Sequence, residues 1–111
     1  GEPKGPVPTE IMMCAYAGAT AMLLYRITQG MGITIHELEV DARDIYSPRG
    51  IGGIEGYYPC YTEIEVDIKI RTDAASDQIE QFKFDWRLRC TAYGVLAASG
   101  AEMKENWDLS A

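Results

Sequence analysis

The stretch PTEIMMCAYAGATAMLLYRITQ, residues 8–29, decides the fold of this sequence. Thr9 is a residue type that caps helices and Glu10 puts negative charge into the first turn, so a helix is predicted to begin here. The glycines that follow the stretch supply a stop signal. Residues 11–25 are apolar on nearly every side of this helix, which predicts that it is buried at the centre of the domain. Small residues that would let another backbone approach closely lie in the same stretch: Ala15, Ala17, Gly18, Ala19 and Ala21.

Two segments downstream of this helix alternate between apolar and charged residues. They are residues 33–47 and 61–73, and the alternation predicts two strands with one face in water. The glycine-rich residues 48–56 are expected to form a loop across which the two strands pair in antiparallel fashion. His36 falls on the apolar side of the first strand, where a core histidine bonded to the backbone is a more common arrangement than a catalytic base or a ligand.

In the last third of the chain, the spacing of the apolar residues changes twice. Residues 76–90 carry apolar side chains at helical spacing, residues 91–99 follow as a short helix, and residues 101–109 alternate as a strand. The predicted order α-β-β-α-α-β describes an α+β protein, and residues 1–111 are expected to form a single domain. The side chains expected on one face of the last strand are Met103, Glu105 and Trp107.

Composition and charge exclude several classes of function. The 111 residues carry a net charge of −7 without a basic run, so neither nucleic acid nor a membrane surface is expected as a partner. The uncharged run at residues 11–25 is too short to span a bilayer. Residues 1–8 lack the features of a signal segment, and the missing initial Met is consistent with processing or truncation of this end.

Cysteine usage and the glycine motifs bear on location and cofactors. The chain has three cysteines without a CxxC pair and one histidine, which argues against a disulfide scaffold or a metal site and for a cytoplasmic location. The sequence GIGG at residues 50–53 precedes no helix and therefore is not a phosphate-binding fingerprint. We expect neither a metal nor a cofactor.

The order of elements and four motifs resemble the OsmC/Ohr family, the osmotically inducible and organic hydroperoxide resistance proteins. The motifs are PTEIMMCAYAGATAM, GITIHELEVDARD, YTEIEVDIKI and RLRC, and the resemblance extends from Gly5 to Leu109. It implies an intertwined α+β homodimer with a buried central helix packed on an antiparallel sheet. It also implies active sites at the dimer interface, where two cysteines reduce organic hydroperoxides.

When the family's catalytic residues are matched to this sequence position by position, the resulting catalytic site is incomplete. Pro8 and Glu10 match the opening of the family's central helix, and Gly18 matches the residue before the peroxidatic cysteine. That cysteine position is Ala19 in this chain, whereas Cys90 matches the resolving cysteine. The family's first strands, and the arginine that they usually supply, have no counterpart before the helix.

The positions of the three cysteines in the sequence lead to different expectations of whether each is a reactive thiol. Cys14 lies five residues before Ala19, which is about 140° around the helix and about 7.5 Å along it, so the two positions cannot share a pocket. We expect Cys14 to be a buried, inert core residue and Cys60 to be a chance surface residue. For Cys90 two interpretations stand: a thiolate favoured by neighbouring arginines, or a buried cysteine at a helix end.

Two hypotheses of function follow. The favoured one is a divergent family member in which Ala19 enlarges a dimer-interface pocket for a small apolar ligand, with very weak turnover of hydroperoxides. The alternative is a one-cysteine thiol peroxidase that uses Cys90. Ala19→Cys is expected to raise turnover. The candidate catalytic residues are Cys90 and Glu10, and the candidate ligand-binding residues are Ala19, Tyr16, Thr20 and Met22.

Overall fold

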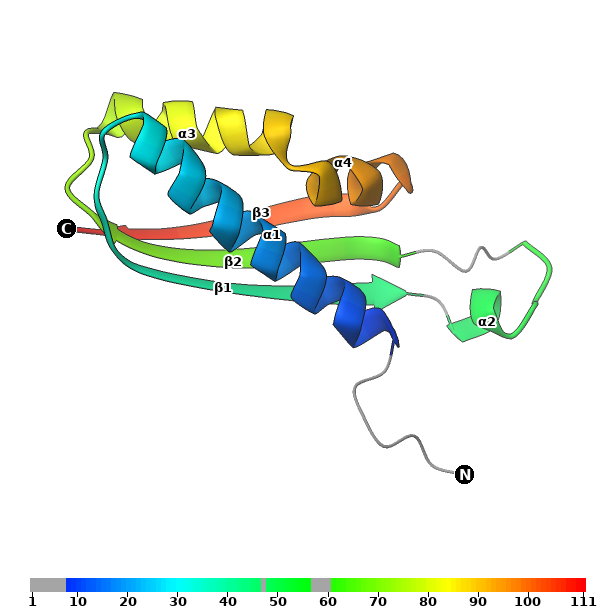
Figure 1. Cartoon of the computed structure of the whole chain (residues 1–111). Coiled ribbons are helices and arrows are strands. Elements are labelled where there is room, and N and C mark those ends of the chain that lie inside the picture. Colours follow the sequence, from blue (N-terminus) through cyan, green and yellow to red (C-terminus); the bar gives the residue numbers. More distant parts are fainter. Residues whose placement is uncertain (1–7, 47, 57–60) are drawn as a thin grey trace.

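The structure, a computed structural model, describes residues 8–46, 48–56 and 61–111. Its two layers are a sheet and the helices α1, α3 and α4, which lie together on one face of that sheet (Figure 1). The α+β class predicted from the sequence is therefore confirmed. The elements are α1 Pro8–Gly30, β1 Ile35–Tyr46, α2 Pro48–Ile51, β2 Tyr61–Thr72, α3 Ser76–Arg89, α4 Thr91–Ala98 and β3 Glu102–Ser110.

The sheet has the strand order β1-β2-β3 and is mixed. β1 pairs with β2 in antiparallel register, with Val40 opposite Ile68, as expected for a hairpin. β2 pairs with β3 in parallel register, with Ile68 opposite Trp107, so the expectation of a wholly antiparallel sheet is wrong at this strand. The cause is the connection: α3 and α4 carry the chain back to the end of the sheet at which β2 began, so β3 runs in the same direction.

Two local features depart from the simple sequence pattern. A short helix, α2, occupies part of the segment that was expected to be a loop. The register of β1 also shifts between Ile35 and Glu37, so strict alternation fails there. As a result His36 is exposed instead of lying in the core, and its Nε2 is 2.9 Å from Oδ2 of Asp73.

The core lies between the sheet and the helices and centres on Trp86, which is fully buried. The Tyr16 ring stacks on Trp86 with centroids 6.5 Å apart, and the rings of Tyr93 and Trp107 meet it edge-on at 5.2 and 5.6 Å. Apolar residues of the central strand and of α3 complete this layer: Ile64, Val66, Ile68, Ile70 and Phe82.

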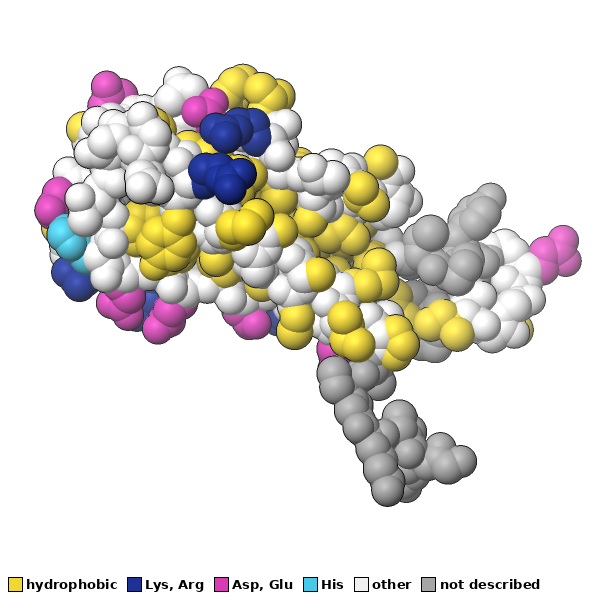
Figure 2. All heavy atoms as spheres, in the orientation of Figure 1, with side chains coloured by type: hydrophobic (Ala, Val, Ile, Leu, Met, Phe, Trp, Pro, Cys, Tyr) yellow, Lys and Arg dark blue, Asp and Glu magenta, His cyan; other side chains and the backbone are white. Residues whose placement is uncertain are grey.

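α1 is buried on one face only. Ile11, Met22 and Tyr25 are 53%, 61% and 49% exposed, so the expectation that this helix is covered on every side is wrong for the single chain. Figure 2 shows hydrophobic side chains spread over the face on which α1 lies in Figure 1. The sheet and the two longer helices after it cover the opposite side of α1, and nothing in the described residues covers this one.

α1 is also the one helix in the described part of the chain that is long and apolar enough to cross a membrane. It is longer than the uncharged run on which the sequence argument rested, because the helix continues past Arg26. The core helix of a soluble protein passes the same test, and the packing of α1 against the sheet is consistent with that role.

Candidate functional site

Tyr16 and Thr20, two of the candidate binding residues, lie where α1 crosses α3. Both side chains are buried. The indole Nε1 of Trp86 donates a hydrogen bond to Thr20 Oγ1 at 3.3 Å, and the Tyr16 ring stacks on the same indole. These contacts anchor the helices to one another. A contact with a ligand stays a prediction for both residues.

Cys90 lies at the junction of α3 and α4, where it is the C-cap of one helix and the N-cap of the next. Its backbone N–H donates to the Trp86 carbonyl at 2.9 Å, and its own carbonyl accepts from the Gly94 N–H at 3.0 Å. The residue is 4% exposed. The structure thus places the candidate thiol behind the surface, in agreement with the second of the two interpretations of Cys90.

Tyr16 and Cys90 both belong to the buried core, and the Tyr16 hydroxyl is sensitive to charge in this region. Burial raises the pKa of Tyr16 well above its usual value, and the charges that Cys90, Glu105 and Tyr93 would carry raise it further. The Tyr16 phenol therefore stays protonated at neutral pH. A protonated phenol can donate a hydrogen bond, but it cannot replace a thiolate as a nucleophile.

Glu105 joins this region from β3, and the sequence argument gave it no role. Arg87 on α3 donates two hydrogen bonds to the Glu105 carboxylate, from Nε at 2.8 Å and from Nη2 at 2.7 Å. Trp107 Nε1 donates a third hydrogen bond to this carboxylate at 2.9 Å. Burial acts to raise the pKa of Glu105, but the hydrogen bonds from Arg87 and Trp107 outweigh it, so the pKa is lowered. A charged residue on the apolar side of a predicted strand was the signal for this partly buried carboxylate.

The Arg87–Glu105 pair changes the interpretation of the sequence RLRC. The hydrogen bond with Glu105 raises the pKa of Arg87, which shows that its charge is used to hold this carboxylate. Of the two arginines beside Cys90 in the sequence, Arg87 is therefore paired with Glu105, whereas Arg89 is exposed. The pair fixes the end of α3 against the sheet, directly before the cysteine.

The other three candidate residues lie at further positions along α1. Ala19 is partly buried against the core. Met22 is exposed on the open face of α1, and Glu10 is exposed in its first turn. Of the six candidates, three are buried and contact Trp86, namely Tyr16 and Thr20 through their side chains and Cys90 through its backbone N–H.

Cys14 is exposed, so the expectation of a buried core cysteine is wrong for the single chain. It lines an open groove of about 670 Å³ on the β1 side of α1, together with Glu10 and Asp44. One oxygen of Asp44, Oδ2, is buried there with no hydrogen-bond partner among the described residues. Cys60 lies outside the described residues.

An apolar pocket lies on the other side of α1, against α4. It consists of two adjoining hollows of about 240 and 370 Å³, which share Met12, Val95 and Leu96. Residues of the hairpin border the smaller hollow on one side, and there the Tyr61 hydroxyl donates a hydrogen bond to Met12 Sδ at 3.2 Å. Two groups of residues complete the lining: Thr9, Tyr46, Ile51 and Ser99 in the smaller hollow, and Ala15, Tyr16, Thr91 and Ala92 in the larger one.

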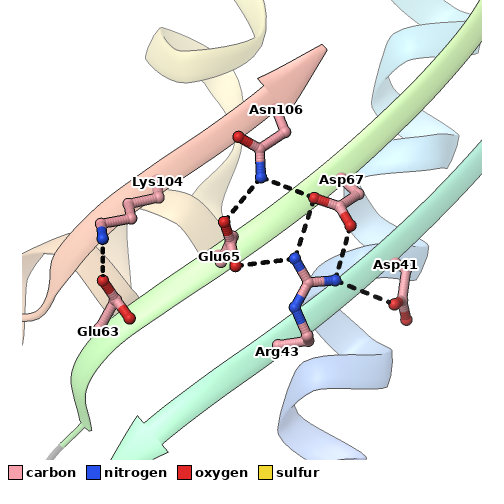
Figure 3. A network of polar contacts seen from close by, with 7 residues as sticks. All are labelled: Asp41, Arg43, Glu63, Glu65, Asp67, Lys104 and Asn106. Carbon is pink, nitrogen blue, oxygen red and sulfur yellow. Dashed lines mark hydrogen bonds and ion pairs between the residues drawn. The ribbon is translucent and has the colours of Figure 1, made fainter. Parts of the chain in front are cut away.

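The outer face of the sheet is polar, and Arg43 on β1 is paired with several of its carboxylates. Arg43 donates to Asp67 at 2.7 Å and to Glu65 at 2.8 Å. These hydrogen bonds raise the pKa of Arg43 and lower the pKa of both carboxyl groups. The described residues include no group of three or more His, Cys, Asp or Glu side chains that could hold a metal ion. Figure 3 shows the network: Asp41, Arg43, Glu63, Glu65, Asp67, Lys104 and Asn106.

The sequence profile of the OsmC-like protein family matches residues 1–106, and the chain belongs to this family. No curated protein matches the sequence. Among solved structures, an OsmC-like protein from Mycoplasma pneumoniae aligns with a TM-score of 0.84 and 21% identity, over 98% of this chain and 75% of that one.

Two further solved structures carry names that refer to hydroperoxides. An organic hydroperoxide resistance protein OsmC from Legionella pneumophila aligns with a TM-score of 0.62 and 10% identity, over 100% of this chain and 74% of that one. The organic hydroperoxide resistance protein OhrB of Bacillus subtilis aligns with a TM-score of 0.57 and 14% identity, over 96% and 72%. At such identities the likeness establishes a shared fold.

Proposed function

We propose that this OsmC-like protein is a cytoplasmic homodimer that binds a small apolar molecule in the pocket between α1 and α4, and that it turns over organic hydroperoxides only weakly. The observation that carries the proposal is the pair of adjoining hollows around Met12, Val95 and Leu96. Pockets of this kind, apolar with a few polar groups at the margin, are typical ligand sites. Here the marginal groups include the hydroxyls of Thr9 and Tyr61.

Weak peroxidase activity follows from the residues at the thiol positions. Ala19 occupies the position at which the resemblance places the peroxidatic cysteine, and an alanine side chain cannot attack a peroxide. The side chain of Cys90 is buried, with 4% of its surface exposed. The names of two structural relatives make an apolar hydroperoxide, or the alcohol derived from it, the first class of ligand to test.

The homodimer is supported by the open face of α1. Helical spacing places four residues on one side of α1: Ile11, Gly18, Met22 and Tyr25. The three large side chains among them are about half exposed or more. An apolar stripe of this length on a small domain indicates a protein interface. A second α1 is the occupant that fits, because Gly18 has open space around the position of a side chain and would allow close approach.

Ligand binding is tested with 2-phenyl-2-propanol, the alcohol formed from cumene hydroperoxide, by chemical-shift titration. We expect saturable shifts at residues of α1 and α4. Val95→Glu adds a charge at the rim of both hollows, at a side chain that is 65% exposed, and should weaken binding by about tenfold or more, since an unpaired charge beside an apolar ligand is costly. Leu88→Glu is the matched control, because Leu88 is 72% exposed on α3 and lines neither hollow.

Peroxide consumption separates this proposal from the one-cysteine alternative. We expect very slow, dithiol-dependent consumption of cumene hydroperoxide by the unmodified protein, and faster consumption by Ala19→Cys with a disulfide to Cys90 detectable by mass spectrometry. Fast turnover by the unmodified protein that disappears in Cys90→Ser would establish the alternative instead. Failure of 2-phenyl-2-propanol and of related alcohols to bind would refute the ligand proposal.

A further inference from the structure

We propose that Met12 is a specific oxidation site for apolar hydroperoxides, with the Tyr61 hydroxyl as the proton donor to the departing oxygen. This inference rests on the proposed function, because it requires that the apolar pocket admit such a molecule. It concerns a thioether on α1 and a phenol on β2, which are 49 residues apart in sequence. Neither residue is a candidate in the thiol chemistry discussed above.

The position of the Met12 sulfur carries the proposal. Met12 lines both hollows of the apolar pocket and is 48% exposed, so a bound molecule can reach its side chain. Tyr61 lines the smaller hollow, and its hydroxyl donates to the sulfur at 3.2 Å. A peroxide that approaches the sulfur from the pocket therefore meets a nucleophile and a proton donor side by side.

The other described methionines lack this combination. Met13 is buried in the core, and Met31 and Met103 are partly buried. Met22 is more exposed than Met12, at 61%, but it lines no part of the apolar pocket and has no hydroxyl partner among the described residues. Because the proposed dimer would cover the face that carries Met22, free N-acetylmethionine is the reference for an exposed thioether.

The reaction balances without a further reagent. A lone pair of the Met12 sulfur attacks the terminal oxygen of the hydroperoxide, the S–O bond forms and the O–O bond breaks. The Tyr61 proton passes to the departing alkoxide oxygen, and the phenolate takes back the proton of the oxygen now bound to sulfur. The sulfur is oxidised by two electrons to the sulfoxide, and the hydroperoxide is reduced to the alcohol.

The surroundings of Tyr61 keep its hydroxyl protonated. Burial, followed by the charges of Asp44 and Tyr46, raises the pKa of Tyr61, so the phenol is a weak acid that gives up its proton only as negative charge develops on the departing alkoxide oxygen, which is the stronger base. After the reaction, the same hydroxyl can donate to the sulfoxide oxygen, which is a better acceptor than the thioether sulfur. The sulfoxide also places a polar group in an apolar lining, so oxidation of Met12 is expected to lower the affinity for apolar ligands.

The test compares two oxidants on the intact protein. The protein and N-acetylmethionine are exposed in one tube to cumene hydroperoxide or to hydrogen peroxide, and sulfoxide at each methionine is followed by peptide mass spectrometry. With cumene hydroperoxide, Met12 should be oxidised at least about tenfold faster than N-acetylmethionine. This factor is smaller than the rate gain that a well-positioned general acid typically gives. With hydrogen peroxide, which has no apolar group to bind, this preference should be lost.

Two controls make the result specific. Tyr61→Phe keeps the ring in the pocket and removes the hydroxyl, and it should bring Met12 close to the rate of N-acetylmethionine. In the unmodified protein, saturating 2-phenyl-2-propanol should protect Met12 and leave Met22 unchanged. Equal preference for both oxidants, or no protection despite measured binding of the alcohol, would overturn this inference while the proposed function stands. Absence of alcohol binding would overturn both.

Discussion

The two faces of α1 have nearly the same apolar character but opposite surroundings. On one face Met13, Tyr16 and Leu24 are at most 4% exposed against the sheet and α3. On the other face Met22 and Tyr25 are 61% and 49% exposed, with nothing from the described residues over them. An apolar pattern therefore predicts which side chains tend to avoid water, whereas the surroundings of each face decide whether they are covered.

The largest effect is expected on the buried face. Leu24→Ala removes a fully buried side chain and should lower the free energy of unfolding by about 2–5 kcal/mol, because the cavity cannot refill. Met22→Ala is its partner on the open face and should cost less than about 0.5 kcal/mol in a dilute, monomeric sample. Chemical denaturation of both variants measures the difference.

Protein concentration sharpens this comparison. If a second copy covers the open face, the cost of Met22→Ala should grow as the protein concentration rises, because the variant then loses interface as well. The cost of Leu24→Ala should change little with concentration. Equal costs for both variants at every concentration would mean that the two faces are covered alike, and the single-chain picture of α1 would be wrong.

Much of the fold could be predicted from the sequence, because periodicity reports burial locally. The pattern placed the bounds of α1, β2 and α3 within about one or two residues, which is the usual uncertainty of helix ends. The direction of β3 could not be obtained in this way, since it depends on where α3 and α4 return the chain. The exposed position of His36 likewise depends on a bulge that no alternation pattern shows.

The site was harder to predict than the fold, because its contacts join distant segments. Tyr61 and Met12 meet across 49 residues, and Arg87 meets Glu105 across 18. Spacing along one helix or strand carries no information on such pairs. The exposure of Cys14 in the single chain was missed for a related reason, since the apolar pattern of α1 does not show which of its sides the rest of the same chain covers.

The two described cysteines give the next largest contrast. Cys90→Ser replaces a buried thiol with a more polar hydroxyl and should lower the free energy of unfolding by about 1–3 kcal/mol. Cys14→Ser lies at an exposed position and should change stability by less than about 0.5 kcal/mol. Thermal unfolding of both variants tests this. Labelling by a thiol reagent adds an independent check, in which Cys14 should react first and Cys90 only after local opening.

A smaller effect is expected at the Arg87–Glu105 pair. The pKa of Glu105 is lowered, so its contribution to stability is present above the usual glutamate value of about 4.3 and is lost as the pH falls through the lower folded value. Glu105→Gln should cost about 1–2 kcal/mol at neutral pH and much less in acid. Unfolding curves from pH 7 to pH 2 should therefore converge. A constant difference across this range would show that the charge of Glu105 is not what stabilises the pair.

The smallest change decides what covers the open face of α1. Gly18→Ala improves helix propensity, and the new methyl group meets no atom within 4 Å in the single chain. If the face is free, the variant should be more stable by about 0.5–1 kcal/mol. If a second α1 approaches closely at Gly18, the methyl group should weaken the dimer, and sedimentation would show a higher dissociation constant. Gly94→Ala in α4, where the added methyl group also meets no atom, is the matched control and should stabilise the chain without changing its association. A dimer that forms equally well in both variants would place its interface away from the open face, however apolar that face is.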